Sequence, residues 1–194
     1  MREYLAGLPE GDWKQKAMVA ASGEVMSDNP VEAIVWAEQL SPGERQTGLL
    51  GMATLDWARR DPEAAAQWVS RVDDPALQEQ LVGSLTVGYA DTDPMQAADC
   101  ALQLLRPGAV LDRSLAEIAW TWAMRDPLTA VVWVAQFPEG PARQMALGHV
   151  LGIWGNRDGA AALAWIENLP PGPLQTEAAS DLLATLPAGE FTMP

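Results

Sequence analysis

Apolar residues in this chain recur at helical spacing, and each such run stops at a proline or a glycine. Between Pro127 and Phe137, the apolar positions Ala130, Trp133, Val134 and Phe137 fall at i, i+3, i+4 and i+7. That spacing places them on one face of a helix. Alternation with a period of two is absent, and so is an Asn-Gly hairpin turn. The pattern predicts an all-α protein.

The predicted helices begin with a capping residue followed by proline. Asp126 precedes Pro127, and an aspartate carboxylate at this position accepts a hydrogen bond from a free amide of the first turn. Proline suits the first helical position, because the amide hydrogen that it lacks has no partner there. A second helix begins at Gly140-Pro141 and carries apolar residues on one face as far as Trp154. The two helices together predict a helical hairpin.

These signals return along the chain at a nearly constant spacing, a period of about 32 residues. The anchors of the repeated units are Pro30, Pro62, Pro94, Pro127 and Gly159. The chain is therefore expected to form an all-α, right-handed α-solenoid of about five antiparallel helical hairpins. Residues 1–194 are expected to form a single helical-repeat domain with a partial unit at each end.

Two kinds of residue recur at fixed places in this period and predict how the units pack. Aromatic residues form two columns, with Cys100 in one tryptophan place: Trp36, Trp68, Cys100, Trp133 and Trp165, then Trp57, Tyr89, Trp122 and Trp154. We expect both columns to lie in the core. Small residues form two more columns: Gly51, Gly83, Ala116 and Gly148, then Ala58, Ala90, Ala123 and Gly155. Because glycine weakens a helix interior, its repeated use predicts close contact between helices.

The unit from Trp57-Ala58 through Asp61-Pro62 to Trp68 resembles the helical-hairpin repeats of the tetratricopeptide-like superfamily. The resemblance covers nearly the whole chain, as a divergent repeat whose period is slightly shorter than is usual for that superfamily. It implies a scaffold that binds proteins or peptides without catalysis.

The net charge of the chain limits the kinds of partner that it can bind. It has 26 acidic and 12 basic residues, a formal net charge of −14. Binding to nucleic acid depends on basic groups that neutralise phosphates, so we expect no nucleic-acid partner and no anionic membrane surface. A basic protein or peptide fits better, although acidity also serves solubility alone.

No stretch reaches the roughly 20 apolar residues that a membrane span needs. The start of the chain, Met1 to Leu5, lacks the apolar core of a secretory signal. By default the expected location is the cytoplasm, the alternative being a fragment of a longer, exported protein. The oligomeric state is left open.

Residues that carry chemistry are scarce. The chain has one cysteine and one histidine, which excludes an internal disulfide and the common zinc sites. His149 is expected on the surface, and Cys100 is expected to act as a small apolar filler. Glycine-rich phosphate loops, nucleophile elbows and calcium-binding loops are all absent. The sequence predicts no enzyme, no cofactor and no metal.

One apolar row lies opposite the buried stripe of the second helices and is the predicted partner surface. Its members are Leu55, Val87, Trp120 and Met124. Contiguous exposed apolar surface usually marks a partner site, but superhelical twist could bury this row instead. A second candidate lies on outer positions of the first helices: Val31, Val35, Leu128 and Val132.

Three functions remain after these exclusions. The first is a non-catalytic scaffold that binds a protein or a peptide. The second is a solenoid that binds a glycan or a small ligand through Trp13 and Trp120. The third is an acidic mimic of nucleic acid that inhibits a basic protein. Salt separates the third from the first, because added salt weakens a charge interaction and spares an apolar one.

Overall fold

The computed structural model describes residues 11–185 of the chain. Helices account for 80% of these residues, and no strand occurs among them. The all-α prediction is confirmed for this part of the chain. The chain divides into two compact units between Thr92 and Asp93. The predicted partial units reach into residues 1–10 and 186–194, which lie outside the described residues.

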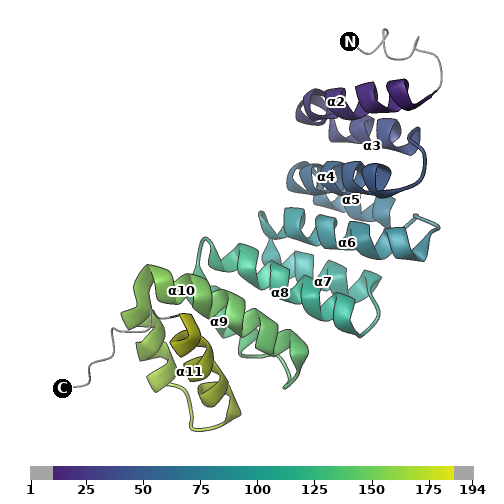
Figure 1. Ribbon diagram of the computed structural model, residues 1–194. Coiled ribbons are helices and arrows are strands. Elements are labelled where there is room, and N and C mark those ends of the chain that lie inside the picture. Colours follow the sequence, from purple (N-terminus) through teal and green to yellow (C-terminus); the bar gives the residue numbers. More distant parts are fainter. Residues whose placement is uncertain (1–10, 186–194) are drawn as a thin grey trace. The chain divides into compact units, whose positions relative to one another are not determined.

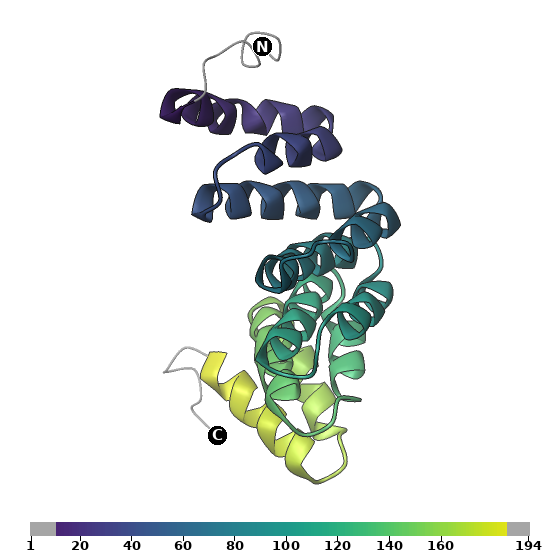
Figure 2. The same ribbon diagram turned by 90° about the vertical axis from the view of Figure 1, so that its right-hand side faces the viewer.

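The first unit contains five of the described helices, in purple to blue-green in Figure 1. They are α2 (Asp12–Asp28), α3 (Pro30–Glu38), α4 (Glu44–Arg60), α5 (Pro62–Val69) and α6 (Pro75–Ala90). Each helix packs against the next one in the chain, and α4 also packs against α2 and, extensively, against α6. Figures 1 and 2 show α4 and α6 side by side. The second helices of successive hairpins are therefore direct neighbours in this unit.

The second unit contains the remaining described helices. They are α7 (Pro94–Leu104), α8 (Ala109–Ala123), α9 (Pro127–Val134), α10 (Pro141–Glu167) and α11 (Pro173–Thr185). Helix α8 packs against α7, α9 and α10, and α10 packs against α9 and α11. Helix α10 bends at Asp158, whose φ of −156° and ψ of 78° are not helical. The bend, visible in Figure 1, lies next to the predicted anchor Gly159.

Aspartate or asparagine side chains cap the helices that begin at the predicted anchors. In each case the side chain accepts a hydrogen bond from a backbone amide two or three residues on: Asn29, Asp61, Asp93, Asp126 and Asp158. Prolines occupy the first turn of α3, α5, α7 and α9. The predicted caps are confirmed, including that of the second arm of α10, which is the part after the bend (residues 159–167).

Asp126→Ala is expected to lower the free energy of unfolding by about 0.5–2 kcal/mol, the usual cost of losing a cap. The Asp126 carboxylate accepts hydrogen bonds from the Thr129 hydroxyl and amide, and these bonds lower its pKa. Because the pKa is lower in the folded state, this stabilisation is present at neutral pH and is lost as the pH falls through the folded-state pKa. Denaturant unfolding at several pH values checks this. A variant as stable as the wild type at neutral pH would contradict it.

The tryptophan column is only half-buried, contrary to the prediction. Trp36, Trp68, Trp133 and Trp165 all keep part of their surface exposed. The innermost places belong instead to small side chains three residues earlier, such as Ala65 and Ala130, which are completely buried. An indole is too large for the gap between closely packed helices. Three of the four tryptophans pair instead with a tryptophan of the second column, as Trp68 does with Trp57 at 6.2 Å between ring centroids.

The small-residue columns make close contacts at some positions and not at others. Ala58, Ala90 and Ala123 are completely buried. A Cβ atom on Gly155 would lie 2.7 Å from Cδ1 of Leu182, so only glycine fits there without rearrangement. A Cβ atom on Gly83 would meet nothing within 4 Å. The prediction of close contact is therefore right for the alanine column and for Gly155, and wrong for Gly83.

Candidate functional site

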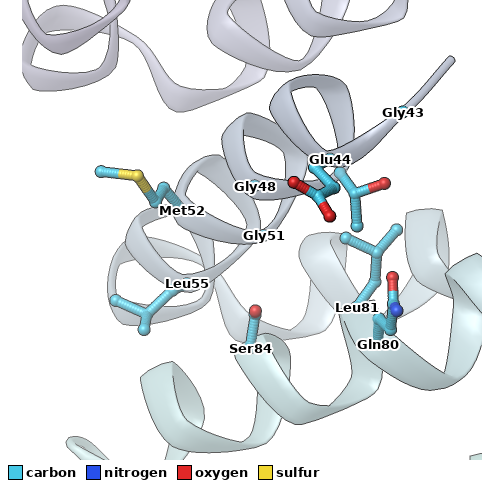
Figure 3. Close-up of a pocket in the computed structure, with 10 residues that line it drawn as sticks. Gly43, Glu44, Gly48, Gly51, Met52, Leu55, Gln80, Leu81 and Ser84 are labelled. Atoms are coloured by element: carbon cyan, nitrogen blue, oxygen red, sulfur yellow. The ribbon is translucent and has the colours of Figure 1, made fainter.

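A groove of about 670 Å³ runs between α4 and α6 in the first unit (Figure 3). We call it the α4–α6 groove. Its lining residues are Gly43, Glu44, Thr47, Gly48, Gly51, Met52, Leu55, Gln80, Leu81 and Ser84. All but three of them belong to α4 or to its N-cap, so the sequence of α4 largely determines the shape of the groove.

Two glycines on α4 create the hollow. A Cβ atom on Gly48 would have nothing within 4 Å, so this side of the helix is open. A Cβ atom on Gly51 would lie 3.1 Å from the Ser84 hydroxyl oxygen, and Figure 3 shows Ser84 pointing from α6 toward Gly51. The two helices thus come close at Gly51, while the space beside Gly48 stays free.

The groove has an apolar side formed by Met52 and Leu55 of α4, and Figure 3 shows Leu81 on the opposite side, next to Gln80. Leu81 is completely buried, Leu55 is half-buried, and 61% of the surface of Met52 is exposed. Methionine is flexible and adapts to differently shaped apolar partners. This side of the groove can therefore receive an apolar side chain without a large rearrangement of the fold.

The other side of the groove, where Leu81 is completely buried, exposes polar groups and carries a negative charge. Glu44 is exposed in the first turn of α4, next to the N-cap Gly43. Gln80 and Ser84 of α6 supply an amide and a hydroxyl group. None of the ten lining residues is basic, so no lining group neutralises the carboxylate. This side favours a cationic or hydrogen-bonding partner group over an anionic one.

The predicted row of partner residues divides between the two units. Leu55 lies on α4 and lines the groove, and half-buried Val87 lies on the adjacent helix α6. Trp120 lies on α8 of the second unit with 43% of its surface exposed, and Met124, 50% exposed, caps the same helix. The partner-binding role of the four residues stays a prediction. The sequence did not predict Glu44, Gln80 or Ser84 as partner-binding residues. The signal that could have pointed to them is the glycine pair Gly48 and Gly51, which opens the groove.

The other predicted apolar residues are exposed as well. Trp13 on α2 has 72% of its surface exposed. The outer positions of the first helices have 41–51% of their surface exposed: Val31, Val35, Leu128 and Val132.

Histidine and cysteine, the usual metal ligands and nucleophiles, are scarce in this chain, with one of each. No three histidine, cysteine, aspartate or glutamate residues within residues 11–185 lie close enough to share a metal ion. His149 is exposed, as predicted, with Nδ1 3.3 Å from the carbonyl oxygen of Ala116. Cys100 is half-buried, and burial raises the pKa of its thiol, which makes it a poor nucleophile. No helix in this range is both long and apolar enough to cross a bilayer.

A buried arginine joins α10 to α11 in the second unit. Arg143 is 7% exposed, and its Nε and Nη2 atoms donate to the Glu177 carboxylate at 3.1 and 3.0 Å. Its Nη1 atom donates to the carbonyl oxygen of Phe137. A two-pronged ion pair of this kind fixes the orientation of both side chains. The three nitrogen atoms of the Arg143 guanidinium group therefore all have partners within the fold, and the ion pair has a structural role.

Asp181, one turn after Glu177, has a buried carboxylate oxygen with no hydrogen-bond partner among the described residues. Burial, and then the charge of Glu177, raise the pKa of Asp181. Because the pKa is raised on folding, the ionised carboxylate destabilises the fold at neutral pH. This penalty disappears as the pH falls below the pKa of the unfolded state.

Asp181→Asn is therefore expected to raise the Tm at neutral pH, since asparagine keeps the shape and loses the charge. Thermal melts of both proteins at about pH 7 and about pH 3 test this, and the difference should vanish at the lower pH. A lower Tm for the variant at about pH 7 would show that the carboxylate has a partner that stabilises it.

Comparison of the chain with protein-family models, with curated proteins and with solved structures finds no match. What the chain does has therefore to be inferred from the groove, its lining residues and the charge of the protein.

Proposed function

We propose that this protein is a non-catalytic scaffold that binds a peptide segment of a partner protein in the α4–α6 groove. The observation that carries the proposal is the groove itself, with Met52 and Leu55 on one side and Glu44 on the other (Figure 3). The segment that fits has one apolar side chain for the first side and a lysine or arginine for the second. A net charge of −14 favours the same basic partner at long range.

The expected affinity of one such segment is modest. Burying one leucine-sized side chain contributes about 1.5–3 kcal/mol, and the exposed Glu44 adds at most about 1 kcal/mol. Ordering the segment opposes both contributions. These two contacts alone therefore give a Kd of about 1 mM or weaker, so a peptide that binds more tightly has to make further contacts with the protein.

We also propose that the hairpins form a right-handed α-solenoid of the tetratricopeptide-like kind. The recurring caps at the predicted anchors support this, and so does the packing of α4 on α6 and of α8 on α10. A solenoid gives a peptide-binding scaffold an extended surface formed by equivalent helices.

Selection of peptides from a random display library on the immobilised protein tests the proposed function. Enriched peptides should combine an apolar residue with lysine or arginine. Met52→Lys should weaken their binding at least tenfold, because it removes an apolar contact and places a cation in the groove. Met95→Lys is the matched control, since Met95 is an exposed methionine on α7 outside the groove. Equal loss in both variants would reject the groove as the site.

The same pair of variants separates the acidic-mimic alternative, which the net charge of −14 favours. A mimic of nucleic acid would bind polylysine at low salt, and binding would disappear when salt is raised to about 0.5 M. The two methionine variants would then behave alike, because each adds one positive charge. Peptide binding in the groove should instead keep most of its affinity at high salt.

A further inference from the structure

A second hollow adjoins the α4–α6 groove at the start of α4. It has a volume of about 310 Å³ and is lined by α2, by the loop that leads from α3 into α4, and by the first residues of α4. We call it the α2–α4 hollow. Gly43 and Glu44 line both this hollow and the α4–α6 groove. The two spaces are therefore neighbours within the first unit, one toward α6 and the other toward α2.

The α2–α4 hollow has an apolar wall of its own. Val19 of α2 has 37% of its surface exposed, and Pro42 of the loop is exposed as well. Leu40, which also lines the hollow, is buried. An apolar side chain that enters the hollow is removed from water together with the exposed surface of Val19, and this burial favours binding. The hollow can therefore receive a second apolar side chain of the segment that binds in the groove.

The charges where the two spaces meet decide which one attracts a basic residue. Glu44 lines both spaces, and none of the residues that line the α4–α6 groove is basic. Arg45 lines the α2–α4 hollow and not the groove, so its guanidinium offsets the charge of Glu44 on that side. A lysine or arginine of the partner is therefore attracted to Glu44 from the groove, whereas the hollow suits an uncharged side chain.

A pair of polar side chains in the hollow matches the backbone of a peptide. Nε2 of Gln15 donates to the hydroxyl oxygen of Ser41 at 2.5 Å, and both residues line the hollow. The side-chain carbonyl of Gln15 can still accept a hydrogen bond, and the Ser41 hydroxyl can still donate one. The N–H and C=O groups of a peptide backbone are the complementary donor and acceptor. The hollow thus offers hydrogen bonds to a backbone of any sequence.

We propose that the partner segment continues from the α4–α6 groove past Glu44 into the α2–α4 hollow, so that the protein recognises a basic residue with an apolar residue on either side. This inference rests on the proposed binding of a peptide in the groove. One apolar side chain packs against Met52 and Leu55, the lysine or arginine pairs with Glu44, and the second apolar side chain packs against Val19. The contacts in the hollow supply affinity that the groove alone does not.

Serine-substituted versions of the most enriched peptide from the display selection test this on the unaltered protein. The enriched peptides should carry lysine or arginine between two apolar residues. Replacing either apolar residue by serine should weaken binding about fivefold or more, because each loses its burial against the protein. A peptide that loses affinity on one side of its basic residue only would overturn the proposal.

Two uncharged substitutions in the protein assign each apolar residue of the peptide to its place. Val19→Gln and Met52→Gln should each weaken binding of the unsubstituted peptide about fivefold or more. Each serine-substituted peptide should be insensitive to one of these variants and sensitive to the other, because one of its contacts is already lost. Val35→Gln is the matched control, since Val35 of α3 is an exposed valine that lines neither the groove nor the hollow.

The same variants separate binding in both places from binding in the groove alone. If Met52→Gln weakens binding and Val19→Gln acts like Val35→Gln, the peptide occupies the groove without the hollow, and the extension is wrong while the proposed function stands. If the Met52→Gln and Val19→Gln proteins both bind like the wild type, the peptide uses neither place, and both proposals are wrong. Circular dichroism should show unchanged helix content in all three variants.

Discussion

Trp133→Ala should lower the free energy of unfolding by about 3 kcal/mol, at the lower end of the range for aromatic truncations. The indole of Trp133 lies 5.6 Å from that of Trp122 and 4.6 Å from the ring of Phe137, between centroids. It also packs against the core of the second unit. Partial exposure reduces the cost below that of a fully buried ring. Denaturant unfolding followed by far-ultraviolet circular dichroism measures the change.

Trp120→Ala is the control for this measurement. Trp120 lies in the same unit, on α8, with 43% of its surface exposed and no ring partner among the described contacts. Its loss should cost less than about 1 kcal/mol. If the two variants lost equal stability, Trp120 would be as much a core residue as Trp133, and its predicted role at a partner surface would lose its support.

Gly88→Ala should cost about 2 kcal/mol or more, although alanine is the better helix former. A Cβ atom on Gly88 of α6 would lie 2.3 Å from the carbonyl oxygen of Leu55 and 2.9 Å from Cβ of Ala58. Because the first of these atoms is backbone, no side-chain rotation relieves the clash. Helix α6 would have to move away from α4. The Tm of the variant should fall by several degrees.

Gly48→Ala, on the neighbouring helix α4, should have the opposite effect on stability. Its Cβ atom would meet nothing within 4 Å, so only helix propensity changes, and stability should rise by about 1 kcal/mol. A gain at Gly88, or a loss at Gly48, would contradict the described packing of α4 on α6.

Local features of the fold follow directly from the sequence. A cap such as Asp126 bonds to an amide only three residues away, and proline at the next position needs no distant partner. The sequence period then transfers each cap to the next unit. The second arm of α10 begins in the same way, because Asp158 caps it as Asp126 caps α9.

Features that depend on how helices meet could not be predicted in the same way. The sequence period places Trp133 and Ala130 on one face, but only the distance between helices decides that alanine is innermost. Gly88 stood outside both small-residue columns, yet among the glycines of residues 11–185 an added Cβ atom comes nearest to a neighbouring helix there. Arg143 and Glu177 are far apart in the sequence and pair because α10 and α11 pack together.

The candidate site depends both on the local sequence pattern and on the way in which the helices pack. Leu55 was selected because its place in the period lies opposite the buried stripe, and it does line the groove. The polar side formed by Glu44, Gln80 and Ser84 depends on the contact between α4 and α6 at Gly51, which no local pattern specifies.

Titration of a fluorescent peptide from the display selection into the Gly48→Phe protein tests the proposed groove most directly. The phenylalanine ring should occupy the free space beside Gly48 and leave the core untouched. Gly23→Phe is the control, because Gly23 is an exposed glycine of α2 with nothing within 4 Å of its added Cβ. The proposal predicts at least a tenfold weaker Kd for Gly48→Phe and an unchanged Kd for Gly23→Phe. Wild-type affinity in a folded Gly48→Phe protein would contradict peptide binding in the α4–α6 groove.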